Sequence, residues 1–108
     1  MSKVISFNYG GKDYKLEYNR DAIRAIEREG FSFSEQFGKK PFTETEILFR
    51  NAFLMHHSGI KSSTVNEIFN AFPRKTELIE ALYTMALETA NSIFEEPAEG
   101  KNLNWTIQ

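Results

Sequence analysis

Two short segments near the start of the chain alternate apolar and polar residues on either side of two adjacent glycines, Gly10 and Gly11. Residues 4–9 read VISFNY and residues 14–18 read YKLEY. A period of two is typical of strands with one buried face. Adjacent glycines tolerate the positive φ angles that a tight hairpin turn requires. We therefore predict a β-hairpin over residues 4–18, with Tyr14, Leu16 and Tyr18 on its buried face.

The segment after the hairpin has the signals of a helix. Asn19 is a suitable N-cap for a helix over residues 20–29, and Gly30 suits the position just past its end. Residues 31–41 then form a connector that contains three Phe. We expect this connector to pack onto the domain, with a short helical turn at residues 34–37.

The remaining helices are predicted from capping signals and apolar periodicity. Two threonine–glutamate pairs have the spacing of capping boxes: Thr43 with Glu46, and Thr64 with Glu67. They predict one helix from Thr43 to about His57 and another over residues 65–72. Pro73 should end the latter and open a last helix from residue 74 to residue 94 or 95. The helix that follows Thr43 is apolar on most of its circumference, so it is either central to the fold or partly covered by a partner.

The end of the chain differs in character from the rest. Residues 95–100 are acidic and contain a proline and a glycine, and Leu103, Trp105 and Ile107 then alternate with polar residues. This is the pattern of a short strand, which either pairs with the hairpin edge of its own domain or adds to a neighbour or client. The sequence predicts one α+β, mainly α domain over residues 1–96, with the hairpin packed against three to four helices. Residues 97–108 form a C-terminal arm.

The residue types present do not favour catalysis or metal binding. There is no Cys, which removes thiolate zinc sites and thiol nucleophiles. His56 and His57 are adjacent, so on a helix they point about 100° apart and cannot chelate one metal as residues at i and i+4 do. We interpret them as polar residues at a helix end, where the imidazolium form is favoured by the helix dipole. No serine-nucleophile or phosphate-loop motif occurs, so we expect no enzyme activity and no cofactor.

Charge and hydropathy limit the partners of the chain. The net charge is −2, which does not mark a general binder of nucleic acid. Residues 1–61 carry ten basic and eight acidic side chains, whereas residues 62–108 carry three and seven. This asymmetry, +2 against −4, could favour head-to-tail self-association. No apolar run approaches the roughly 20 residues of a membrane span, and no signal peptide is recognisable, so we expect a soluble cytoplasmic protein.

The N-terminal third of the chain resembles the small tail-assembly chaperones of long-tailed bacteriophages and prophages. The resemblance lies in the hairpin residues 10–18, in the helix start NRDAI at residues 19–23, and in Ile26, Glu27 and Gly30. It implies a non-enzymatic protein of the bacterial host cytoplasm that holds a tape-measure-type tail protein during morphogenesis. It implies no catalytic residues and no cofactor, and it allows for homo-oligomers.

If the resemblance holds, a wide apolar helix face could receive a helical client. The candidate partner-binding residues are Phe49, Phe53, Leu82, Met85 and Trp105, because aromatic residues and Met suit a surface that fits several similar segments. Each of them could instead belong to an ordinary core. Two other functions stay open: a small helix-turn-helix-like DNA-binding regulator, and a structural connector subunit of the virion. The acidic side chains of residues 62–108 count against the regulator.

Overall fold

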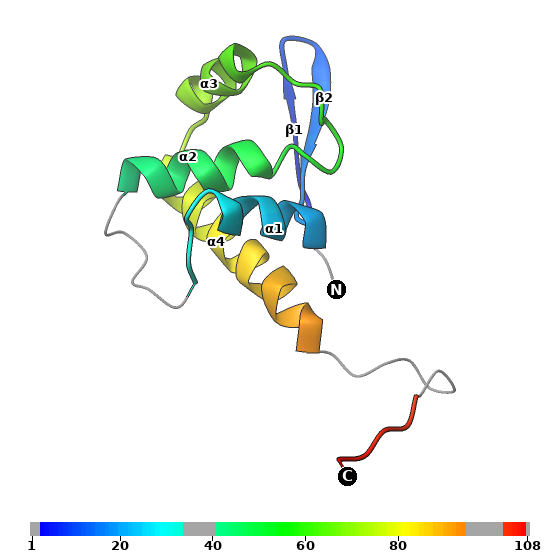
Figure 1. Ribbon diagram of the computed structural model, residues 1–108. Helices are drawn as coiled ribbons and strands as arrows, with labels where there is room; N and C mark the ends of the chain where they lie inside the picture. The colour runs from blue at the N-terminus through cyan, green and yellow to red at the C-terminus, as the bar shows by residue number, and fades with distance from the viewer. Residues whose placement is uncertain (1–2, 34–40, 95–102, 108) are drawn as a thin grey trace.

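The computed structural model describes residues 3–33, 41–94 and 103–107 (Figure 1). In this part of the chain, a two-stranded hairpin precedes four α-helices, which confirms the predicted α+β, mainly α class. The elements in chain order are β1 (Ile5–Tyr9), β2 (Lys12–Leu16), α1 (Arg20–Arg28), α2 (Pro41–Asn51), α3 (Ser62–Ala71), α4 (Lys75–Asn91) and a 3-10 turn, η1 (Ser92–Phe94).

The hairpin forms where the alternating segments predict it. Strands β1 and β2 pair antiparallel, with Tyr9 opposite Lys12 and Phe7 opposite Tyr14. Gly10 and Gly11 connect them with φ angles of 60° and 82°, which residues with a side chain rarely adopt. Tyr14, Leu16 and Tyr18 are buried, as the period of two predicts.

Helix α1 begins and ends close to the predicted residues. The Asn19 side chain accepts a hydrogen bond from the backbone N–H of Ala22 over 2.8 Å, which satisfies one of the free donors of the first turn. Gly30, with φ 94°, follows the C-cap and lets the chain leave the helix. The inner face buries Ala22, Ile23 and Ile26. The helical turn expected at residues 34–37 lies outside the described residues.

Helix α2 differs from its prediction at both ends. It begins at Pro41, so Thr43 lies inside the first turn and is not the N-cap. Proline suits a first helical position because its missing N–H has no partner there. The helix ends at Asn51 and not near His57. The reason is tertiary, since the carbonyl of Ala52 accepts the backbone N–H of Glu17 over 3.0 Å instead of continuing the helix.

The bounds of α3 and α4 also correct the prediction. The cap of α3 is Lys61, whose carbonyl accepts the N–H of Val65 over 3.1 Å, so Thr64 lies within the helix. Arg74 has a positive φ of 52°, which delays the start of α4 to Lys75. At the other end α4 stops at Asn91, and η1 continues the chain for one tight turn. The side chains of Ile93 and Phe94 are exposed, so no packing extends the helix to residue 94.

One core joins the hairpin and the helices. In Figure 1, α4 runs diagonally behind α1 and α2, while α3 and the hairpin lie on the other side of α2. The largest side chains that are fully buried come from five of these elements and from the turn after α2: Leu16, Ile26, Leu48, Phe53, Ile68 and Leu82. Leu16 and Ile68 show that the hairpin and α3 share this core with the other helices.

Residues 103–107 lie away from the hairpin (Figure 1). They belong to no strand, and the sheet of the described residues has only the two strands of the hairpin. The expected pairing of this segment with the hairpin of its own domain is therefore not formed. The other possibility, that this segment pairs with a neighbour or client, concerns an assembly and stays a prediction.

Candidate protein-binding surface

The structure separates the five candidate partner-binding residues into two groups. Phe49, Phe53, Leu82 and Met85 are buried in the core, and no more than 5% of any of these side chains is exposed. Trp105 is 73% exposed. Four of the five candidates are thus covered by the chain's own packing, and Trp105 is the one that remains exposed.

The apolar excess of α2 is explained by aromatic packing inside the chain. The ring of Phe49 lies 5.1 Å from that of Phe53 and 5.1 Å from that of Phe69 of α3, both edge to face. Phe53 in turn contacts Tyr14 of β2 at 6.1 Å. Edge-to-face pairs at these distances are favourable. Helix α2 is therefore apolar on more than one face because α1, α3 and α4 all pack against it.

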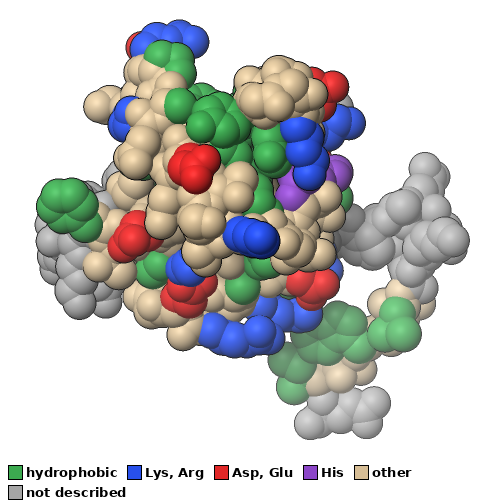
Figure 2. Space-filling model, turned by 90° about the horizontal axis from the view of Figure 1, so that it is seen from above, with side chains coloured by type: hydrophobic (Ala, Val, Ile, Leu, Met, Phe, Trp, Pro, Cys, Tyr) green, Lys and Arg blue, Asp and Glu red, His purple; other side chains and the backbone are tan. Residues whose placement is uncertain are grey.

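The large apolar side chains that remain exposed are concentrated at the C-terminal side of the described chain. Leu103, Trp105 and Ile107 are 84%, 73% and 90% exposed, and Ile93 and Phe94 of η1 are exposed as well. Scattered exposed apolar residues are common, but five large ones between residues 93 and 107 are typical of a binding surface. In Figure 2, one group of hydrophobic side chains lies at the lower right margin of the molecule, and others lie on the main body and at its left margin. The sequence predicts a last helix that extends to residue 94 or 95, and Ile93 and Phe94 are not among the candidate partner-binding residues that it indicates.

The two edges of the hairpin are treated differently by the fold. At the outer edge of β2, the backbone N–H of Lys15 donates to Nε2 of His57 over 3.1 Å. The N–H of Glu17 donates to the carbonyl of Ala52 over 3.0 Å. The Glu17 carboxylate also lies 2.8 Å from Nε2 of His56. The turn that follows α2 thus covers the β2 edge.

His57 acts here as a hydrogen-bond acceptor. Because Nε2 accepts the N–H of Lys15, this nitrogen carries no proton, and a neutral ring holds its proton on Nδ1. Burial lowers the pKa of His57, and the positive charge of Lys12 and the neighbouring His56 add to the effect. The ring also contacts Tyr14 at a centroid distance of 5.1 Å. The interpretation of His57 as an imidazolium at a helix end is therefore wrong, because α2 ends six residues earlier.

The edge of β1 is open. In a two-residue hairpin the residues that flank the turn exchange hydrogen bonds, and bonded and non-bonded pairs then alternate. Tyr9 and Phe7 therefore point their backbone groups at β2, whereas Ser6 and Asn8 point theirs outward. Among the described residues, these outward backbone groups have no hydrogen-bond partner. A row of unpaired groups of this kind is a template for another strand.

A groove of about 350 Å3 runs along this open edge, between β1 and the end of α3. Its size is in the range of small ligand pockets, roughly 300–1,000 Å3. Apolar side chains line most of it, namely Ile5, Phe7, Tyr9, Ile68, Phe72 and Pro73. Arg74 is the charged residue among those that line it.

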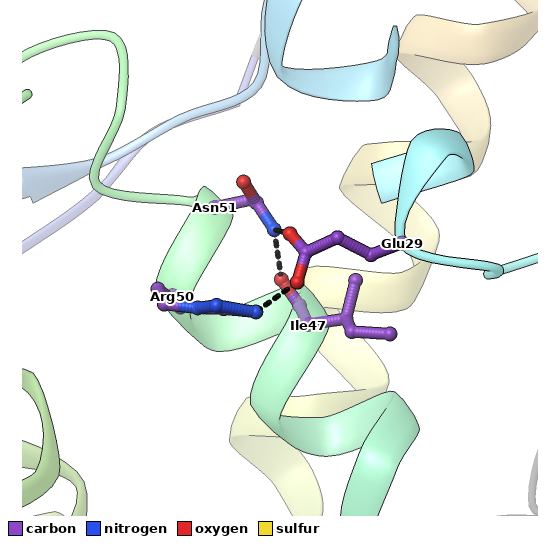
Figure 3. A network of polar contacts seen from close by, with 4 residues as sticks. All are labelled: Glu29, Ile47, Arg50 and Asn51. Carbon is purple, nitrogen blue, oxygen red and sulfur yellow. Dashed lines mark hydrogen bonds and ion pairs between the residues drawn. The ribbon is translucent and has the colours of Figure 1, made fainter. Parts of the chain in front are cut away.

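A second groove, of about 360 Å3, lies between α2 and α3 and is bordered by a polar network (Figure 3). Asn51 donates from Nδ2 to the Glu29 carboxylate over 2.7 Å and to the carbonyl of Ile47 over 2.8 Å. Arg50 forms an ion pair with the other Glu29 oxygen. These contacts tie the end of α1 to α2. Because both oxygens of the Glu29 carboxylate have partners, Asn51 and Arg50, we interpret this network as one that stabilises the packing of α1 on α2.

The described part of the chain shows no metal-ligand cluster and no membrane-spanning helix. Three or more His, Asp or Glu side chains do not converge anywhere within it. Its helices are also too short or too polar to cross a bilayer. On the face shown in Figure 2, basic and acidic side chains are interspersed over most of the body, and several basic side chains adjoin at its lower margin.

The fold and the surface define a small α+β protein, mainly helical, with an open strand edge and an exposed apolar C-terminal segment. The whole chain, residues 1–108, matches the model of a family described as a domain of unknown function, DUF5055, and the chain belongs to this family. Comparison with curated proteins and with solved structures gave no match.

Proposed function

We propose that this chain is a non-enzymatic tail-assembly chaperone or adaptor of phage type, which binds a tape-measure-type tail protein through its C-terminal arm. The observation that carries the proposal is the exposure of Leu103, Trp105 and Ile107. The core buries most apolar side chains of the helices, whereas Leu103, Trp105 and Ile107 stay exposed and are available to a client.

The arm has the chemistry of a protein-binding segment. Three large apolar side chains alternate with Asn104 and Thr106, so in an extended conformation they lie on one face. An extended segment can add to a sheet edge through main-chain hydrogen bonds, while alternate side chains fill pockets. A central tryptophan flanked by aliphatic residues is typical of the few residues that dominate binding energy.

Charge does not support the alternative of a DNA-binding regulator. Helix α3, which would be one half of a helix-turn-helix, carries Glu67 as its charged residue. Helix α4 carries Lys75 against Glu77, Glu80 and Glu88. Acidic side chains on both helices would be repelled by the phosphate backbone. A virion connector subunit would use the same apolar arm, and it differs from a chaperone in remaining in the finished particle.

The test is co-purification of the tagged chain with the tail proteins encoded beside it, co-expressed individually. We expect a long helical tail protein to be retained, and Trp105→Ala to weaken its binding by roughly tenfold or more. Phe42→Ala is the matched control, because Phe42 is 87% exposed but lies at the start of α2. Equal binding by wild type and Trp105→Ala would contradict the role of the arm. Recovery of DNA without a protein client would favour the regulator.

A further inference from the structure

We propose that the open edge of β1 receives residues 103–107 of a second copy of the chain as a third strand. The inference concerns contact between copies and is tested without a client; it uses the same residues as the proposed client contact, so one arm makes only one of the two contacts at a time. It assigns a partner to the groove along β1 and to the exposed arm, two features that the single copy leaves without one.

The first support is the difference between the two hairpin edges. The β2 edge is closed by the turn after α2, through the bonds from Lys15 to His57 and from Glu17 to Ala52. The β1 edge has no equivalent cover in the described structure, and Ser6 and Asn8 direct their N–H and C=O groups outward. Proteins normally blunt or cover such an edge, because it pairs readily with another strand.

The second support is the match between the arm and the edge. Residues 103–107 and strand β1 both alternate apolar with polar side chains. In a strand added to β1, Leu103, Trp105 and Ile107 would share the face of Phe7 and the groove, while Asn104 and Thr106 would share the outer face of Ser6 and Asn8. The groove also supplies aromatic neighbours, since Phe72 lies 5.0 Å from Phe7 at its wall.

Charge favours the same contact. The segment that precedes residues 103–107, residues 95–102, contains three Glu and one Lys. Arg74 lines the groove. In sequence, Lys3 precedes the lining residue Ile5 by two positions, and Lys75 directly follows Arg74. Lys3 pairs with Glu88 and Arg74 with Glu77, and both ion pairs are solvent-exposed and therefore weak. An acidic segment from another copy could compete for them.

Symmetry favours a reciprocal exchange of arms between two copies over the one-way addition of an arm to a neighbour. When each copy lends its arm to the other, both arms and both β1 edges are covered and a closed dimer forms. A one-way addition leaves a free arm and a free edge, so it continues into a longer chain of copies. The arm of the same copy is the competing occupant. Eight residues, 95–102, separate it from η1 and could span about 26–29 Å, so the test must distinguish the two.

The sequence contains one Trp, which makes Trp105 a specific reporter of arm burial. We propose to measure tryptophan emission and molar mass by light scattering on the purified full-length chain across a wide range of concentration. A second copy as occupant predicts a blue shift of the emission that develops together with the mass of a dimer or larger assembly. A blue shift that is independent of concentration in a monomer would mean that the arm binds its own edge, and it would overturn the proposal. A monomer with solvent-exposed Trp105 at all concentrations would also overturn it.

Two variants test the β1 edge and the arm separately. Ser6→Pro removes an outward N–H that the hairpin itself does not use, and proline is tolerated on edge strands. We expect it to weaken association by roughly tenfold or more, whereas Ser6→Ala, which keeps the N–H, should leave association unchanged. Ile107→Lys tests the arm, since this side chain is exposed and contributes nothing to the monomer core, and it also replaces Ser6→Pro if that variant fails to fold by circular dichroism. Undiminished association of the folded variant would contradict the inference, and because no client is present, the result is independent of tail-protein binding.

Discussion

The backbone N–H of Lys15 donates to Nε2 of His57 over 3.1 Å, so an imidazole takes the place of a neighbouring strand at the edge of β2. The next outward N–H, that of Glu17, is satisfied by the carbonyl of Ala52. Both acceptors belong to the stretch in which α2 was expected to continue. The early end of α2 and the closed edge of β2 are therefore one structural feature. The β1 edge lacks a cover of this kind among the described residues.

The first prediction concerns pH. The pKa of His57 is lowered in the folded chain, so between the folded value and the ordinary value of about 6.5 the unfolded chain binds more protons. The free energy of unfolding should therefore level off above about pH 6.5 and decrease as the pH falls below it. Urea unfolding at several pH values between 5.5 and 8 measures this. In His57→Gln the decrease should be smaller, and an unchanged slope would show that other groups cause it.

The second prediction concerns Tyr18. Its hydroxyl donates to the carbonyl of Leu48 over 2.7 Å, and burial raises the pKa of the phenol, so it stays protonated as a donor. Tyr18→Phe should lower the free energy of unfolding by about 1 kcal/mol, the net value of one such bond. The loss should not be larger, because the Leu48 carbonyl also accepts the N–H of Ala52. Chemical denaturation measures it, and a loss above about 3 kcal/mol would contradict this account.

The third prediction ranks two members of the polar network in Figure 3. Asn51 is 5% exposed and donates to Glu29 and to the Ile47 carbonyl, so Asn51→Ala should cost about 1.5–3 kcal/mol. Arg50 is the charged partner, but its side chain is partly exposed, so Arg50→Gln should cost only ~0–1 kcal/mol. The two variants are compared by urea unfolding at one pH. The reverse order would mean that the ion pair, and not the amide, joins α1 to α2.

The local elements could be predicted from the sequence because their signals are local. Gly10 and Gly11 define the turn, and Asn19 and Gly30 define the ends of α1, through contacts within a few residues. The end of α2 could not be predicted, since it depends on a bond from Glu17, which is far away in sequence. The capping-box spacing misled at Thr43 because a threonine followed three residues later by glutamate also fits a helix interior.

The candidate site was predicted only in part, for a related reason. Apolar periodicity shows how much of a helix avoids water, but not whether the chain itself or a partner covers it. Phe49 and Met85 therefore looked like interface residues and are core. Trp105 was recognisable because its alternation with polar residues follows a stretch rich in Glu, Pro and Gly. The exposure of Phe94 depends on where α4 stops, which the sequence did not indicate.

The last prediction separates core from surface among the five sequence candidates. Leu82 is fully buried in α4, so Leu82→Ala should lower the free energy of unfolding by about 2–5 kcal/mol through lost contacts and a cavity. Trp105→Ala should change it by less than about 0.5 kcal/mol, because the indole is exposed in the single copy. The measurement is thermal and urea unfolding at a concentration low enough to keep the chain monomeric. A large loss for Trp105→Ala under these conditions would place the arm on its own domain, and it would remove the surface on which both proposals depend.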